Sequence, residues 1–478
     1  MEAGSVRLRV CLLAEANPKS WWVPYYVDAF RERCDVVTVG TSPDAAPPQT
    51  EAERLLAQMV APNDIELDQP SAECLAARLS AGWHPHLVVA VQSSGIVLHG
   101  IERLACPTAY ITVDTWHEPN EYLAAPHYDF VFVAQRSFIP LLRATGSRRV
   151  SWLPLACSPK FHHPVPAEPD YDVVFVGSLD QAIYAQRIRR LEALGDRFSV
   201  ATLKTFFREE MCAVTCRGRL VFNSSVFEDI NMRVFEALAM GRPLLTNADA
   251  ATNGLLELFS DGVHLITYTD DTLVEKAQQY LDDPEAREAV ARAGRAEVLA
   301  RHTYAHRVDT LIEAIRAACP ALDTAPASVL REGASPADRL PAAPGAVVDL
   351  EGALANPPAA NSVDTVVLPD PGGLPVPLGE AVRAAHSWLT EGGAFVAQLD
   401  LQHLEREGVD ASLGAWVAWF RQLDFHLLDL SESGQGAYAV TARKRTKPLL
   451  DVCRALYARH PMEGVTDAVL CALIAPDR

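Results

Sequence analysis

The stretch from Asn223 to Glu236 gathers residue types that suit the binding of a nucleoside diphosphate. Asn223 and Ser224 end an apolar, strand-like run, and an amphipathic helix is expected to begin near Asn231. The first turn of a helix presents free backbone N–H groups and a partial positive charge, which together favour a phosphate anion. Arg233 falls in that turn and can add charge-assisted hydrogen bonds. The segment therefore predicts a diphosphate site at a helix N-terminus.

Two glutamates flank this helix start. Glu236 lies three residues after Arg233 on the same helical face, where its carboxylate can accept hydrogen bonds from both hydroxyls of a ribose. Glu228 lies in the preceding loop, from which it can touch a sugar. The alternative is that Arg233 and Glu236 form a solvent-exposed ion pair worth roughly a few tenths of a kcal/mol. Spacing alone leaves both interpretations open.

A second set of candidates follows an earlier apolar run. Asp114 and His117 come directly after residues 108–113, at the end of a predicted strand. Either side chain can act as a general base toward an attacking acceptor. The alternative is that Asp114 caps the following turn and that His117 only lines the pocket. A zinc site is not predicted, because His302 and His306 have helical spacing but no further ligands.

The elements that must position these residues fall into two successive α/β blocks. Strand-like apolar runs alternate with amphipathic segments between residues 6 and 155, and again between residues 171 and 319. Such alternation indicates parallel sheets that are covered on both faces. We expect one Rossmann-like domain over residues 1–165 and a second over residues 166–319. The ligand would bind in the cleft between them, at the carboxyl ends of the strands.

The remainder of the chain has a different character. Residues 320–346 contain five prolines among many alanines, which predicts a linker. Residues 347–478 contain further strand-like runs, such as 365–368, 394–399 and 438–441, and helix-like segments at 378–389 and 413–422. This pattern predicts a smaller third α/β domain.

Composition excludes several classes of protein. The 478 residues are 49% hydrophobic and carry a net charge of −19, which suits globular domains and argues against non-specific binding to nucleic acids or anionic membranes. No run approaches the roughly 18 apolar residues of a membrane span. The ten cysteines are scattered, as expected for buried thiols in a reducing compartment. We therefore expect a cytoplasmic protein with no nucleic-acid partner and no integral membrane segment.

A collinear set of motifs runs through the first two blocks. Glu228 and Glu236 are separated by seven residues, and other recognisable segments are 128–135 (YDFVFVAQ), 152–156 (WLPLA), 171–178 (YDVVFVGS), 223–225 (NSS), 233–237 (RVFEA) and 302–307 (HTYAHR). The glutamate spacing resembles the E-x7-E signature of retaining GT-B glycosyltransferases. The whole set resembles the CgeB-like (spore-maturation) glycosyltransferases, over about residues 85–312. The resemblance implies a GT-B fold and transfer of a sugar from a nucleotide-diphosphate donor. It also implies that residues 1–165 form the N-terminal, acceptor-side domain and that residues 166–319 form the nucleotide-sugar-binding domain.

The resemblance also implies roles for individual residues. Glu236 would bind the donor ribose, Glu228 would contact the donor sugar, and the amides around 230–232 would hold the diphosphate together with Arg233. For Arg187, a phosphate contact and an ordinary surface charge are both open. The expected catalytic residues are Asp114, His117 and Glu228, and the expected donor-binding residues are Gly177, Ser178, Arg187, Asn223, Ser224, Ile230, Asn231, Met232, Arg233 and Glu236.

The expected reaction needs neither a metal nor a cofactor beyond the donor. No D-x-D motif lies where a GT-A enzyme would hold its metal, and a helix N-terminus with an arginine can stabilise a leaving diphosphate in place of a divalent cation. The resemblance at Glu228 favours retention of configuration, whereas a base at Asp114 favours inversion. The acceptor can be a protein, a glycan or a small molecule. The chain departs from the larger group where residues 229–231 (DIN) replace a glycine that usually follows the first glutamate.

Residues 346–443 resemble the later half of a class I methyltransferase, through 365–368 (TVVL), 389–396 (LTEGGAFV) and 425–428 (FHLL) in that order. The glycine-rich loop for S-adenosylmethionine is missing, because residues 345–350 contain no G-x-G. We expect a degenerate domain that docks a protein acceptor or partner.

Two other functions fit the first two blocks. One is a nucleotide-sugar epimerase or hydrolase, and the other is a non-catalytic protein that retains the donor pocket.

Overall fold

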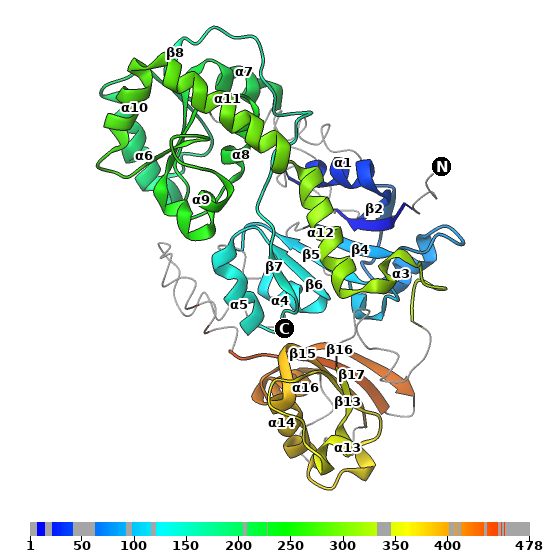
Figure 1. Cartoon of the computed structure of the whole chain (residues 1–478). Helices are drawn as coiled ribbons and strands as arrows, with labels where there is room; N and C mark the ends of the chain where they lie inside the picture. The colour runs from blue at the N-terminus through cyan, green and yellow to red at the C-terminus, as the bar shows by residue number, and fades with distance from the viewer. Residues whose placement is uncertain are drawn as a thin grey trace.

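The chain folds into three α/β domains, each built on one sheet (Figure 1). This confirms the predicted fold class of two tandem domains with parallel sheets and a smaller third domain. The computed structural model describes residues 7–14, 22–41, 63–91, 98–115, 121–203, 208–226, 228–331, 346–400, 406, 408, 413–434, 437–447, 451 and 454.

The first domain has a parallel sheet in the order β3-β2-β1-β4-β5-β6-β7. Alternate residues of each central strand enter separate cores on its two faces; Val88 belongs to one and Val89 to the other. This explains why β4, with the sequence LVVAV, is buried throughout. The strands are β1 Arg9–Leu13, β2 Asp35–Thr41, β3 Ile65–Leu67, β4 Leu87–Val91, β5 Thr108–Thr112, β6 Phe130–Val133 and β7 Val150–Trp152, and the helices are α1 Val23–Arg33, α3 Ala72–Arg78, α4 Glu121–Ala124 and α5 Ile139–Ala144.

The second domain has a parallel sheet in the order β12-β11-β10-β8-β9. Strand β10 lies at its centre, so the loop that follows Asn223 opens at the carboxyl edge of the sheet. The strands are β8 Tyr171–Val176, β9 Val200–Leu203, β10 Gly218–Asn223, β11 Leu244–Asn247 and β12 Ile266–Tyr268, and the helices are α6 Gln181–Gly195, α7 Arg208–Cys216, α8 Met232–Ala239, α9 Leu255–Leu258, α10 Leu273–Asp282 and α11 Pro284–Arg301.

Helix α12 (Tyr304–Ala318) returns the chain to the first domain (Figure 1). The sequence grouping placed it in residues 166–319, but it packs against α1, and its apolar face, including Val308 and Leu311, completes a core of the first sheet. The outgoing and returning chains meet where Cys157 N–H donates to His302 O (3.0 Å) and Tyr304 N–H donates to Cys157 O (3.0 Å). The second domain is thus inserted between two segments of the first.

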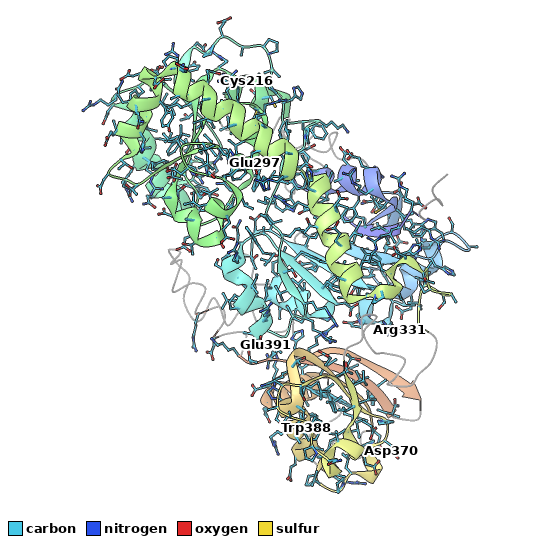
Figure 2. The ribbon with its side chains drawn as sticks, in the orientation of Figure 1. Cys216, Glu297, Arg331, Asp370, Trp388 and Glu391 are labelled. Atoms are coloured by element: carbon cyan, nitrogen blue, oxygen red, sulfur yellow. The ribbon has the colours of Figure 1, made fainter. Side chains whose placement is uncertain are left out.

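The third domain has the strand order β13-β14-β15-β17-β16, parallel from β13 to β15 and antiparallel where β17 meets its two neighbours. Its sheet packs beneath the first domain, and Arg331 and Glu391 lie at their boundary (Figure 2). A cavity between the two is lined in part by Glu102, Asp129 and Arg443. The elements are β13 Val347–Asp349, α13 Leu350–Ala355, β14 Val363–Leu368, α14 Leu378–Trp388, β15 Leu389–Asp400, α16 Leu413–Gln422, β16 Phe425–Gly434 and β17 Ala437–Lys444.

The start of the predicted linker lies against the first domain. Residues Pro320–Asp323 form a 3-10 helix, and Leu330 forms a β-bridge with Leu104. Arg331 donates from Nε to Leu104 O at 2.8 Å. Residues 332–345 lie outside the described part of the chain. Among the described residues, no helix is long and apolar enough to cross a membrane.

Candidate functional site

The N-terminus of α8 has the geometry of an anion site. Asn231 is the N-cap, yet its side chain makes no capping bond to the first turn in the described structure. Its Nδ2 instead donates to Asn223 Oδ1 (3.1 Å) and Ser225 Oγ (3.3 Å). The N–H groups of Met232 and Arg233 belong to this first turn, so the helix start keeps donors that its own cap does not use.

Arg233 lies over the end of β8. Its Nε donates to Val176 O at 2.8 Å, its Nη1 donates to Asn223 Oδ1 at 2.6 Å, and its guanidinium stacks 4.5 Å above the ring of Phe175. Burial lowers its pKa to about 9. These contacts contradict the alternative of an exposed ion pair with Glu236, because the guanidinium is committed to β8 and β10.

Gly177 makes room for that guanidinium. A Cβ at this position would lie 2.2 Å from Arg233 Nη2 and 3.0 Å from Phe175 Cζ, so no side chain fits. Gly177, one of the expected donor-binding residues, is approached here by Arg233. Glycine at this position is therefore required by the site even before a ligand is considered.

Glu236 is a buried acid on the same helix. Only 9% of its surface is exposed. Burial raises its pKa to about 7, and the nearby charge of Arg233 opposes that shift. Near neutral pH the group therefore exchanges between a carboxyl and a carboxylate. A hydrogen bond from a ligand to the carboxylate would shift this balance toward the charged form.

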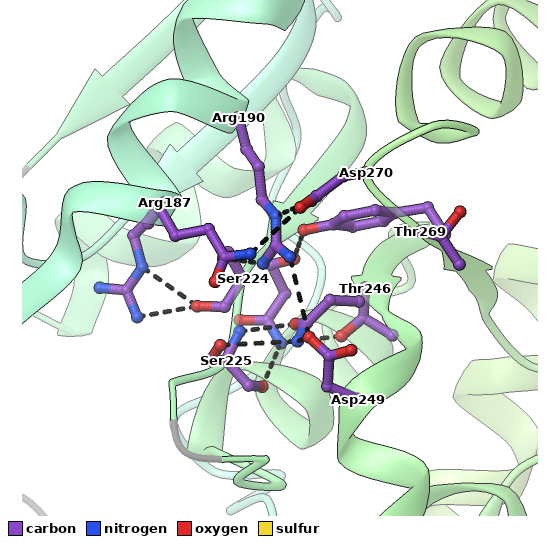
Figure 3. A network of polar contacts seen from close by, with 12 residues as sticks. Arg187, Arg190, Ser224, Ser225, Thr246, Asp249, Thr269 and Asp270 are labelled. Carbon is purple, nitrogen blue, oxygen red and sulfur yellow. Dashed lines mark hydrogen bonds and ion pairs between the residues drawn. The ribbon is translucent and has the colours of Figure 1, made fainter. Parts of the chain in front are cut away.

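Arg187 on α6 organises the loops around this centre. Its Nε and Nη2 both donate to Ser224 O (3.1 and 2.8 Å; Figure 3), and its Nη1 donates to Ser178 O (2.8 Å). It is only 5% exposed, which contradicts the alternative of a surface charge. Its bonds to backbone carbonyls hold the loops after β8 and β10 together; a phosphate contact stays a prediction.

Sequence reasoning missed Arg190 and Tyr268. Arg190 donates to Ser224 Oγ (2.8 Å) and pairs with Asp270 (2.6 Å) (Figure 3), and Tyr268 Oη donates to Asn223 O (2.8 Å). The i,i+3 spacing of Arg187 and Arg190 placed both on one helical face and was an available signal. Tyr268 comes from β12, which is separated from β10 by β11, and carried no such signal.

The amide of Ile230 is engaged by the first domain. Its N–H donates to Gln135 Oε1 (3.0 Å), and Gln135 Nε2 donates to Ile230 O (3.4 Å). Of the three amides expected to hold a diphosphate, this one already has a protein partner. The backbone of Ile230 thus joins the two domains, because Gln135 lies two residues after β6 and faces the loop before α8; a phosphate contact of this amide stays a prediction.

The acid candidates from the two domains approach one another. Asp229 is only 7% exposed, and burial, Asp114 and Glu228 together raise its pKa well above the ordinary value. Asp114 follows β5 of the first domain, so this cluster spans both domains. Glu228 has a left-handed backbone (φ 62°), held by a 2.9 Å bond from Asn253 Nδ2 to its carbonyl. His117 lies outside the described residues.

Further bonds lock the two domains beside this cluster. Arg136 makes a bidentate pair with Glu257 (2.6 and 2.7 Å) and stacks on Trp152. Ser137 N–H donates to Asn253 Oδ1 at 2.8 Å. Within the described part of the chain, no group of three or more His, Cys, Asp or Glu residues is arranged to hold a metal ion.

Comparisons with known proteins place one segment in a family context. Residues 158–313, less than half of the chain, match the family model described as "Glycosyl transferase-like". No curated protein matches the chain.

Three solved structures are similar to the chain at low identity. They are sucrose-phosphate synthase from Thermosynechococcus elongatus (14% identity, 65% of this chain and 100% of that chain, TM-score 0.46), Anabaena Alr3699/HepE in complex with UDP and glucose (13%, 65% and 100%, TM-score 0.46), and an alpha-glucosyltransferase in complex with UDP and a 13-mer DNA (9%, 65% and 99%, TM-score 0.47). The donor-binding candidates, from Gly177 to Glu236, all lie inside the segment that matches the glycosyl transferase-like family, whereas Asp114 and His117 lie outside it.

Proposed function

We propose that this protein is a glycosyltransferase that takes a sugar from a nucleotide-diphosphate donor bound at the N-terminus of α8. The observation that carries the proposal is the grouping of a helix start, Arg233 and the buried Glu236 within six residues, inside the segment that matches the glycosyl transferase-like family. A helix start with an arginine suits a diphosphate, and a buried carboxylate suits a ribose.

The proposed roles follow from these positions. Glu236 accepts hydrogen bonds from the ribose hydroxyls, and the amides of Asn231 and Met232, with Arg233, hold the diphosphate. Positive charge at this point stabilises the leaving nucleoside diphosphate without a divalent cation. Arg187 holds the loops after β8 and β10. It could contact a phosphate only by giving up one of its hydrogen bonds to the carbonyls of Ser178 and Ser224.

In the proposed reaction an acceptor oxygen bonds to the anomeric carbon while the bond from that carbon to the diphosphate oxygen breaks. The acceptor proton passes to a base, and the nucleoside diphosphate leaves with the bonding electron pair. Asp114 is the candidate base for inversion, and Glu228 is the candidate sugar contact for retention. Asp114 and Glu228 both act electrostatically on Asp229, so either stereochemical course would take place where the first and second domains meet.

We also propose the finer assignments that the motifs imply. The enzyme is a CgeB-like, hexosyltransferase-type protein of the cytoplasm, and its acceptor is a protein, a glycan or a small molecule. The third domain is a remnant of a methyltransferase that docks a protein acceptor or partner. The strand order β13-β14-β15-β17-β16, with β17 antiparallel, supports this origin.

Differential scanning fluorimetry with UDP, GDP, ADP, CDP and TDP tests the proposal. A ligand that binds only the folded chain adds about 2.7 kcal/mol to the free energy of unfolding at one hundred times its Kd, and this raises Tm. We expect one nucleotide to raise Tm and Glu236→Ala to abolish the rise. Glu288→Ala, on the exposed face of α11, is the matched control and should keep it.

The remaining outcomes separate the competing functions. No rise with any nucleotide would contradict the proposal. Binding followed by donor breakdown or isomerisation without any acceptor would identify a hydrolase or epimerase. Binding without turnover across acceptor classes would identify a non-catalytic protein.

A further inference from the structure

His162 lies where the chain crosses from the first domain to the second, in a segment that none of the motifs singled out. It follows β7 and precedes β8, and its side chain is fully buried. Its Nε2 lies 3.4 Å from Glu236 Oε1 and 3.3 Å from Tyr25 Oη. A residue of the crossing segment thus contacts the proposed ribose-binding acid directly.

The protonation of the His162 ring is set by its other nitrogen. Ser158 N–H donates to His162 Nδ1 at 3.0 Å, so Nδ1 must be an unprotonated acceptor. The neutral ring then carries its proton on Nε2, the atom that faces Glu236. The ring can donate to a carboxylate there but cannot accept a proton from a carboxyl group.

Aromatic packing fixes the orientation of this ring. Tyr25 of α1 meets His162 edge-on, with ring centroids 5.0 Å apart, and also packs against Tyr304 of α12 at 5.3 Å. Both tyrosines belong to a core of the first domain. The packing of the first domain therefore fixes His162, the hydrogen-bond donor, whereas Glu236, the hydrogen-bond acceptor, belongs to the second domain.

We propose that His162 is a positioning residue, which holds Glu236 as a carboxylate by donating a hydrogen bond from Nε2. The inference rests on the proposed function, because it explains how a buried acid stays able to accept two ribose hydroxyls. The donated bond favours the ionised form of Glu236 and fixes one of its oxygens, which leaves the other for a ligand.

The other titratable groups that face Glu236 do not replace this bond. Arg233 favours its ionised form, but the described guanidinium contacts run to Val176 and Asn223. Cys157 and Tyr304 also face it, and both are neutral near pH 7, because burial raises the pKa of Cys157 to about 12 and that of Tyr304 well above its ordinary value.

The test compares His162→Phe with His162→Gln. Phenylalanine keeps a ring against Tyr25 but has no donor, whereas the glutamine amide can place N–H near the position of Nε2. The measurement is the Kd of the nucleoside diphosphate that stabilises the wild type, from pH 6 to 9. For His162→Phe we expect an upward shift of the pH midpoint by about one unit, which gives about fivefold weaker binding at pH 7 and near-complete recovery by pH 8.5.

His163→Phe is the control, because the neighbouring histidine is exposed; its midpoint should match the wild type. His162→Gln should restore the midpoint. An unchanged midpoint in His162→Phe, whatever its affinity, would overturn the proposal.

A ligand-free measurement separates this proposal from the proposed function. When the Nε2–H group of His162 is removed, the ionised form of Glu236 loses stabilisation. The Tm of His162→Phe should therefore fall further below that of the wild type as pH rises from 5 to 8. The part of that loss that depends on Glu236 should vanish in a Glu236→Gln background, where only the effect of removing the neutral His162 ring remains. A pH dependence that is the same in both backgrounds would overturn the role of His162, even if no nucleotide binds.

Discussion

At the scale of single residues, the site depends on polar groups that are removed from water and then given partners. Asn223 shows this most clearly: its Oδ1 accepts from Asn231 and Arg233, and its Nδ2 donates to Ser225 (3.2 Å) and Thr246 (2.9 Å). A satisfied side chain of this kind costs little to bury and fixes the groups around it. Glu236 differs, because its burial leaves it poised between two protonation states.

Glu236 makes stability depend on pH. Its folded-state pKa of about 7 exceeds the ordinary 4.5, so the folded chain binds more protons and loses stability as pH rises between these values. Glu236→Gln removes the titrating group. Relative to the wild type, it should gain stability from pH 5 to 8, by up to about 3 kcal/mol. Chemical denaturation at both pH values checks this, with Glu288→Gln as the control; a difference that is constant with pH would contradict it.

At the scale of elements, α8 is held in place by α11. Gly294 of α11 faces α8 and the turn before β12: a Cβ there would lie 2.3 Å from His264 O and 2.7 Å from Leu238 Cδ2. Two elements can pack this closely only where one contributes no side chain. The position of the proposed diphosphate site therefore depends on a glycine about 60 residues further along the chain, which no local pattern marks.

Gly294→Ala should separate α11 from α8. Overpacking against a backbone carbonyl costs about 1–3 kcal/mol, and the shift of α8 should also weaken nucleotide binding. Gly195→Ala is the matched control, because nothing lies within 4 Å of its Cβ position and alanine suits a helix better than glycine by up to about 1 kcal/mol. Equal Tm values for the two variants would contradict the packing argument.

Local patterns predicted the elements of this site well. The sequence placed a helix at 231–240, and α8 spans Met232–Ala239; it placed another at 304–318, and α12 spans Tyr304–Ala318. These boundaries follow from periodicity and from caps such as Thr303, which are encoded within a few residues. The partners were not predicted, because the bond from Ile230 to Gln135 spans 95 residues and leaves no mark in either segment.

At the scale of the whole molecule, helix α12 belongs to the first domain although it follows the second domain in the chain. Leu311 follows the second domain in the chain but is fully buried in a core of the first. Leu238 of α8 is also fully buried, in a core that is built mainly from the second domain. These two leucines allow the domains to be perturbed separately.

Leu311→Ala should destabilise the first domain by about 2–5 kcal/mol, because it leaves a cavity beside β1 and β4. Amide hydrogen exchange should rise in those strands more than in β10 and β11. Leu238→Ala is the reciprocal variant and should raise exchange in β10 and β11 first. If Leu311→Ala raised exchange mainly in the second domain, the assignment of α12 to the first core would be wrong.

The return of α12 has a consequence for biosynthesis. A ribosome releases the strands of the first sheet about 150 residues before the helix that covers one of its faces. The inserted second domain contains its own sheet and is synthesised before α12. It can therefore fold while Val10, Leu12 and Val89 are not yet packed against that helix. A nascent chain arrested before residue 304 should therefore expose this apolar face to chaperones, and release of α12 should end that exposure.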